Sequence, residues 1–172
     1  MDSIVPERIE TDRLILRVFQ DEDWRDLHEY YSDEIATRFT LPRKLSQLET
    51  WLYMCGMIGH WRIRGYGPYA VEEKVSGKVL GLVGFWYPNK WPSPEIKWAL
   101  ARQHWGKGFA SEAARAVQRA GREYIPDISL ISLIHQENVA SINLAVAIGA
   151  KHEKDIQILG WHWQVWRHPN ET

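Results

Sequence analysis

The chain has 172 residues, an apolar share of 45%, a charged share of 25% and a formal net charge of −1. This size and composition predict a single globular domain over residues 1–172. The near-zero charge gives no electrostatic reason to expect a nucleic-acid or membrane partner, and no apolar run is long enough to span a bilayer.

The cysteine and histidine content bears on disulfide bonds and metal binding. Cys55 is the only cysteine, so an internal disulfide is excluded, and a reducing, cytoplasmic location is expected. No basic and apolar leader opens the chain, so no secretory signal is expected. No two histidines lie within five positions of each other, and we therefore expect no metal site.

The first part of the chain predicts one strand followed by two helices. Leu14, Ile15, Leu16 and Val18 form the predicted strand. Asp21 is expected to cap the short helix that follows. Ser46 and Glu49 have the spacing of a capping box, and apolar residues at helical intervals extend the second helix to about Arg64.

The middle of the chain changes to the two-residue period of strands. Residues 69–73 and 79–87 form a predicted hairpin, and residues 95–100 form a third strand. An alanine-rich helix then runs from about residue 110 to 124, with Gln118 on its solvent face.

The last part of the chain adds a strand, a helix and two strands, at residues 128–135, 138–148, 151–159 and 161–167. The whole order predicts a mixed α+β fold. We expect a largely antiparallel sheet of six to seven strands with about four helices on its faces.

The most informative segment joins the strand at 95–100 to the alanine-rich helix. Its pattern, Gln103-x-x-Gly106-x-Gly108, leaves little side-chain bulk around the helix N-terminus. Bare main-chain N–H groups at the positive end of a helix dipole suit a pyrophosphate. The alternative is an ordinary tight turn between a strand and a helix.

Two further segments carry motifs, Thr11-Asp-Arg-Leu-Ile-Leu-Arg17 near the start and Asn138-x-x-Ser141 near the end. Together with Glu95–Ala113, they resemble the GNAT N-acetyltransferase superfamily, in the branch typified by ribosomal-protein N-terminal acetyltransferases. The resemblance depends on the joint order and spacing of the three segments.

The resemblance implies acetyl-coenzyme A as co-substrate, with its pyrophosphate on the main-chain N–H groups between Trp105 and Ala110. Arg102 and Lys107 either add charge at the rim or are solvated. Asn138 either contacts the pantetheine arm or caps its own helix, and both can hold. The residues expected to bind the cofactor are Leu100, Ala101, Arg102, Gln103, Trp105, Gly106, Lys107, Gly108, Phe109, Ala110, Asn138 and Ser141.

The resemblance also implies direct attack of a primary amine on the acetyl thioester. The oxyanion that forms needs an N–H donor, which by position is the main chain of Leu100 or Ala101. Glu95 stands where some members place a general base acting through water. The alternative for Glu95 is a carboxylate facing solvent at the end of a strand.

The departing thiolate benefits from a proton donor. Many GNAT enzymes use a tyrosine seven residues after the asparagine, but this chain has Ala145 there. Ser141 either donates a proton, only hydrogen-bonds the cofactor sulfur, or satisfies the N-terminus of its own helix.

The acceptor pocket is expected across the sheet from the cofactor. Tyr31, His60, Trp98 and Trp163 are candidates for its walls, with core packing as the alternative for each. Lys97 stands where the resembled branch often has glycine. This departure leaves the identity of the acceptor amine undecided.

The sequence thus favours an N-acetyltransferase acting on a protein N-terminus or a small-molecule amine. The alternative is a GNAT-like sensor or scaffold that binds acyl-coenzyme A without turnover. The sequence leaves the oligomeric state open.

Overall fold

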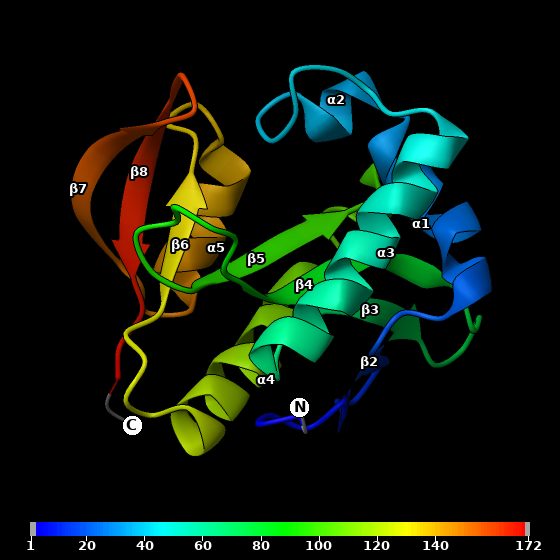
Figure 1. The fold of residues 1–172 in the computed structure, drawn as a ribbon, viewed down its shortest axis with the longest axis horizontal. Helices are drawn as coiled ribbons and strands as arrows, with labels where there is room; N and C mark the ends of the chain where they lie inside the picture. Colours follow the sequence, from blue (N-terminus) through cyan, green and yellow to red (C-terminus); the bar gives the residue numbers. More distant parts are fainter. Residues whose placement is uncertain (1–2, 171–172) are drawn as a thin grey trace.

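The computed structural model describes residues 3–170, which form one eight-stranded sheet with five α-helices (Figure 1). The strands are β1 (Arg8–Glu10), β2 (Leu14–Arg17), β3 (Pro68–Glu73), β4 (Val79–Trp86), β5 (Glu95–Leu100), β6 (Ile131–Ile134), β7 (Lys151–Ile158) and β8 (Trp161–Arg167). The helices are α1 (Trp24–Tyr31), α2 (Glu34–Thr37), α3 (Gln47–Arg64), α4 (Phe109–Tyr124) and α5 (Val139–Ala147), with short 3-10 turns at Asp21–Asp23 and Arg102–His104.

The sheet divides between β5 and β6. Its strand order is β1-β2-β3-β4-β5-β6-β8-β7, and every neighbouring pair is antiparallel except β5 and β6. These two parallel strands pair at one position only, Glu95 with Ile131. Beyond it, β6 swings away with β7 and β8, as Figure 1 shows. We call this divergence the fork.

Helices cover both faces of the sheet because alternate strand residues are apolar on both sides. Helix α4 packs its alanine face onto one side, in a cluster that includes Val83, Ile96 and Phe109. Helices α1 and α3 cover the opposite side, where Leu82 and Ala99 lie among their side chains. The strand β5 is therefore held firmly between two apolar layers.

The expected mixed α+β fold is confirmed, and the sheet is close to the expected size. The strand β1 and the helix α2 were not predicted, because three and four residues are too few to show a period. The capping box of Ser46 and Glu49 is present at the start of α3. None of the helices within residues 3–170 has both the length and the apolar character that a membrane span requires.

Two local predictions were wrong. Asp21 caps no helix: its carboxylate accepts from the Trp51 indole, and Asp23 accepts from the Gln20 N–H instead. Gln118 is buried rather than exposed, with 5% of its surface accessible, because it takes part in a polar network described below.

Candidate active site

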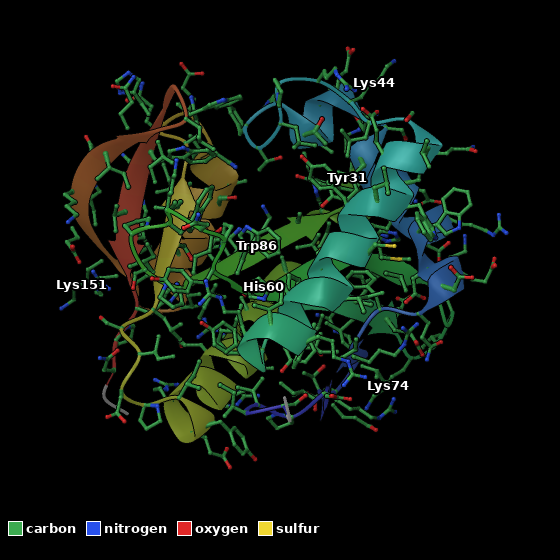
Figure 2. The ribbon with its side chains drawn as sticks, viewed as in Figure 1. Tyr31, Lys44, His60, Lys74, Trp86 and Lys151 are labelled. Atoms are coloured by element: carbon green, nitrogen blue, oxygen red, sulfur yellow. The ribbon has the colours of Figure 1, made fainter. Side chains whose placement is uncertain are left out.

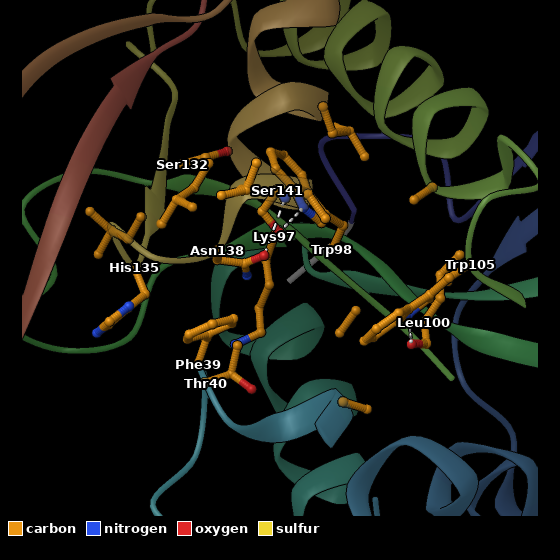
Figure 3. A pocket seen from close by; sticks show the side chains of 18 of the residues that line it. Phe39, Thr40, Lys97, Trp98, Leu100, Trp105, Ser132, His135, Asn138 and Ser141 are labelled. Atoms are coloured by element: carbon orange, nitrogen blue, oxygen red, sulfur yellow. Dashed lines mark hydrogen bonds between the residues drawn. The ribbon is translucent and has the colours of Figure 1, made fainter. Parts of the chain in front are cut away.

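A cavity of about 580 Å³ occupies the fork. Trp98, Ala110 and Leu144 line it on the side of α4 and α5, and Tyr30 and Thr40 line it on the side of α1 and α2. The cavity therefore reaches both faces of the sheet through the gap between β5 and β6. Figure 3 shows part of its lining.

Side chains replace the backbone ladder at the closed end of the fork. In a regular parallel pair, the Leu133 N–H would donate to the Ile96 carbonyl. Here the Ser132 hydroxyl donates to Ile96 O at 2.6 Å, and the Leu133 N–H donates to Glu95 Oε2 at 3.2 Å. The strands can part at this point because side chains satisfy both groups of the interrupted ladder, the Ile96 carbonyl and the Leu133 N–H.

The register of β5 selects one of its main-chain N–H groups for the cavity. The Ala101 N–H donates to Leu80 O at 2.9 Å, which directs it toward β4. The preceding residue, Leu100, lies opposite Gly81 in the antiparallel register of β4 and β5. Because bonding direction alternates along a strand, the Leu100 N–H points away from β4 and toward the open fork.

The glycine loop leads into α4 with its main-chain N–H groups uncovered. Gly106 and Gly108 have φ values of 72° and 79°, in the left-handed region that glycine adopts without strain. Gly108 is the N-cap, and no side chain caps the helix. The first N–H groups of α4 have no intrahelical partner, and Gly108 through Ser111 line the cavity.

Arg13 holds the glycine loop from outside the cavity. Its Nη1 donates to Lys107 O at 2.9 Å, and its Nε donates to Glu112 at 2.7 Å. Its guanidinium also lies 4.5 Å from the centre of the Phe109 ring. These contacts fix the loop conformation without using the N–H groups that face the cavity.

The N-terminus of α5 forms the opposite wall. Asn138 caps this helix through a hydrogen bond from the Ser141 N–H, and both residues line the cavity. The Trp98 indole N–H donates to Ser141 Oγ at 3.1 Å (Figure 3). Because an indole only donates, the Ser141 hydroxyl proton remains available for another acceptor.

Several residues predicted to bind the cofactor lie outside the cavity lining. Arg102 forms an ion pair with Asp33 at 2.8 Å, and Gln103 hydrogen-bonds Glu29. Neither Ala101, which is 1% exposed, nor Lys107 contributes to the lining. By contrast, Leu100, Trp105, Gly106, Gly108, Phe109, Ala110, Asn138 and Ser141 all line the cavity.

The four candidates for the acceptor wall separate into three groups. Trp98 and Trp163 line the cavity, whereas Tyr31 lines a neighbouring side pocket. His60 lies in the core, where it stacks on Trp86 (Figure 2). Its ring nitrogens bond Tyr66 O and the Tyr87 N–H, so His60 has no free position for a substrate.

Glu95 is buried at the closed end of the cavity and does not face solvent as a strand-end carboxylate would. Burial raises its pKa above the ordinary value, while the Lys97 charge and the Leu133 N–H offset part of that rise. A raised pKa makes a carboxylate a stronger base nearer neutral pH.

The residues that line the cavity within 3–170 include no group suited to bind a metal ion.

Sequence reasoning missed a polar network that ties the two sides of the fork. Ser132 Oγ accepts from His168 Nε2 at 2.9 Å, and Gln118 Nε2 lies 3.1 Å from His168 Nδ1. Gln118 also donates to Ile148 O. All three side chains are at least nine-tenths buried, and burial lowers the pKa of His168 to about 4. No local pattern marks residues so far apart in the chain.

Comparisons with known proteins identify the class of this fold. The model of the GNAT acetyltransferase domain matches residues 13–151. The chain is 31% identical to the uncharacterized protein YkkB of Bacillus subtilis, over 87% of this chain and 88% of that one. A GNAT-family acetyltransferase structure from Bordetella pertussis covers 95% of this chain and 100% of its own, with 26% identity and a TM-score of 0.80.

The chain belongs to the GNAT acetyltransferase family and is an acyltransferase. This family uses acetyl-coenzyme A as co-substrate. The fold is also shared with RimL, a ribosomal α-N-protein acetyltransferase in complex with coenzyme A, at 20% identity and a TM-score of 0.76, covering 94% of this chain and 97% of that one.

Proposed function

We propose that this acyltransferase moves an acetyl group from acetyl-coenzyme A to a primary amine by direct attack. The observation that carries the proposal is the cavity in the fork, which joins an uncapped helix N-terminus on one face to an aromatic surface on the other. This arrangement lets both reactants meet at the edge of β5 without a covalent enzyme intermediate.

The donor side of the cavity supplies main-chain groups. The N–H groups between Gly106 and Ala110 bind the diphosphate at the positive end of α4. The Leu100 N–H stabilises the oxyanion that forms on the thioester carbonyl. Ser141 gives its free hydroxyl proton to the departing sulfur, and Asn138 contacts the pantetheine arm.

The amine bound on the acceptor side must be neutral, because only an uncharged nitrogen can attack the thioester. A free α-amino group has a reference pKa of about 7.7–8, against about 10.4 for a lysine, so it needs less help from a base. Glu95 receives the amine proton through water. The acceptor is either a protein N-terminus, as the α-N-protein acetyltransferase RimL suggests by analogy of fold, or a small-molecule amine.

The test is release of thiol from acetyl-coenzyme A over a panel of peptides, amino acids and polyamines. Turnover that depends on one class of amine supports the proposal. Thermal stabilisation by the cofactor with no turnover on any amine would favour the sensor alternative. In the Glu95→Gln variant, kcat/KM should fall, and its acid limb should lose the Glu95 ionisation and retain only the limb that comes from protonation of the amine itself.

A further inference from the structure

Lys97 is the residue of the acceptor side that the proposed function leaves unexplained. It lies on β5 between Glu95 and Ala99, so the three share the strand face that looks toward α1 and α3. Figure 3 shows its side chain running from β5 toward Phe39 and Thr40. The side chain is half-buried and lines the cavity.

The ammonium group of Lys97 forms no hydrogen bond or ion pair with any residue between 3 and 170. By contrast, Arg102, on the turn that follows β5, is paired with Asp33. A half-buried cation that is bonded to no carboxylate attracts an anion more strongly than one exposed to water, because screening is weaker there.

The neighbouring charged groups leave Lys97 able to pair with an added anion. Glu95 acts on Lys97 through space, but its Oε2 is bonded to the Leu133 N–H and burial raises its pKa. Arg38 adds a second cation at the mouth, stacked 4.6 Å from the centre of the Phe39 ring. Glu137, an exposed residue next to α5, is the acidic group on the far wall.

A side pocket of about 50 Å³ opens beside Lys97. It shares Tyr30, Thr40 and Lys97 with the main cavity. Its other walls are almost wholly apolar: Tyr31, Leu41, Tyr53, Met57, Pro68 and Trp86. Sites for drug-sized ligands measure about 300 Å³ or more, so this pocket suits an apolar group of only a few carbon atoms.

We propose that the acceptor is an α-amino acid with a short apolar side chain. Its carboxylate pairs with Lys97, and its side chain enters the side pocket. The amine nitrogen forms the C–N bond as the C–S bond breaks, one amine proton leaves through water, and the thiolate takes up a proton. This inference rests on the proposed function and names its substrate class.

The placement of Lys97 also helps the reaction. A positive charge near the bound amine favours the neutral form of that amine, which is the form that attacks. The same charge repels polyamines, whose additional cations would have to enter this side of the cavity.

The first test compares N-acetyl-L-alanine with N-acetyl-L-alaninamide by titration calorimetry in the presence of coenzyme A. This comparison measures product binding and requires no turnover. The acid should bind about 10- to 100-fold more tightly, because it alone offers a charged partner to Lys97. The ratio should fall to about 1 in Lys97→Gln and persist in Lys97→Arg and in Lys44→Gln, which changes an exposed lysine outside the cavity.

The second test compares kcat/KM for alanine, alaninamide, an alanyl peptide and spermidine. Alanine should be preferred over the other three in the wild type, in Lys97→Arg and in Lys44→Gln, and the preference should be lost in Lys97→Gln. Equal binding of acid and amide, a ratio that survives Lys97→Gln, or a preference for the peptide would overturn the inference. Tight binding of the acid without acetylation of any amine would instead overturn the proposed function, and with it the acceptor role, and would leave only the carboxylate site at Lys97 supported.

Discussion

The two walls of the fork are built differently. The wall of β5 and α4 belongs to the large apolar cluster of the sheet, and α4 presents bare main-chain N–H groups to the cavity. The wall of β6 and α5 rests on a small cluster that includes Ile134, Ala145 and Trp166. Its helix is capped by Asn138, and its polar side chains are tied into hydrogen bonds.

Under the proposed function, the α4 wall binds the cofactor through its main chain, whereas the α5 wall positions its polar groups through side-chain contacts. Main-chain N–H groups are the same for any side chain, so the α4 wall depends on glycine conformation and little else. The α5 wall depends on particular side chains, because their hydroxyl, amide and imidazole groups help the small apolar cluster to hold it in place. Substitutions should therefore have distinct consequences on the two sides.

The largest effect is expected on the α4 wall, from Gly108→Val. A β-branched residue at a φ of 79° is strained, and its Cβ would lie 3.3 Å from Arg13 Nη2. Displacing the loop misaligns several N–H groups together, so the affinity for acetyl-coenzyme A should fall about 100-fold or more. Isothermal titration calorimetry measures this loss.

Gly77→Val provides the matched control. Gly77 has a φ of 69° in the β3–β4 hairpin, has open space around its Cβ position and does not line the cavity. Similar strain at this position should reduce stability but leave cofactor affinity unchanged. Undiminished affinity in Gly108→Val would show that the diphosphate binds elsewhere.

A second effect should appear on the other wall as acid sensitivity. The folded pKa of His168 is about 4, below its unfolded value of about 6.5. The unfolded state therefore takes up a proton first, and stability is lost as pH falls from 6.5 toward 4. Between pH 7 and pH 4.5, this linkage lowers the free energy of unfolding by about 2.5 kcal/mol.

Urea unfolding of the wild type and of His168→Asn isolates this contribution. The stability advantage of the wild type should shrink by about that amount over the same pH interval, because the variant lacks the imidazole. A difference that stays constant with pH would mean that the polar network tolerates a protonated imidazole.

The smallest effect of the three concerns Ser141→Ala. If Ser141 donates a proton to the thiolate, kcat should fall about 10- to 50-fold, a modest loss because a thiol with a pKa near 8.5 departs readily. The acetyl-coenzyme A Kd should change less than about threefold. Single-turnover kinetics and calorimetry give both quantities, and the reverse pattern would make Ser141 a binding residue alone.

The sequence predicted the parts of the cavity that local pattern controls. The strand β5, the glycine loop and the amphipathic helix α4 follow one another within thirty residues, and each has its own period or turn signal. The final hairpin was predicted by Gly160, and the structure places both Leu159 and Gly160 at positive φ. These features need only neighbouring residues to form.

The remaining parts depend on contacts between distant residues. The Ser132 hydroxyl meets Ile96 and His168 across 36 positions each way. Tertiary contacts buried Gln118, although helical spacing placed it on the solvent face. No window of sequence contains both partners of such a bond, so the closed end of the fork could not be predicted.

The passage between β5 and β6 opens on both faces of the sheet, and this has a kinetic consequence for the proposed transfer. In the proposed transfer, the coenzyme lies on the side of α4 and α5 and the amine on the side of α1 and α2, so neither reactant needs to obstruct the other. A bulky amine would stay on the α1 and α2 side of the sheet while acetyl-coenzyme A replaces coenzyme A on the other side. We therefore expect a random order of addition and release for this transfer.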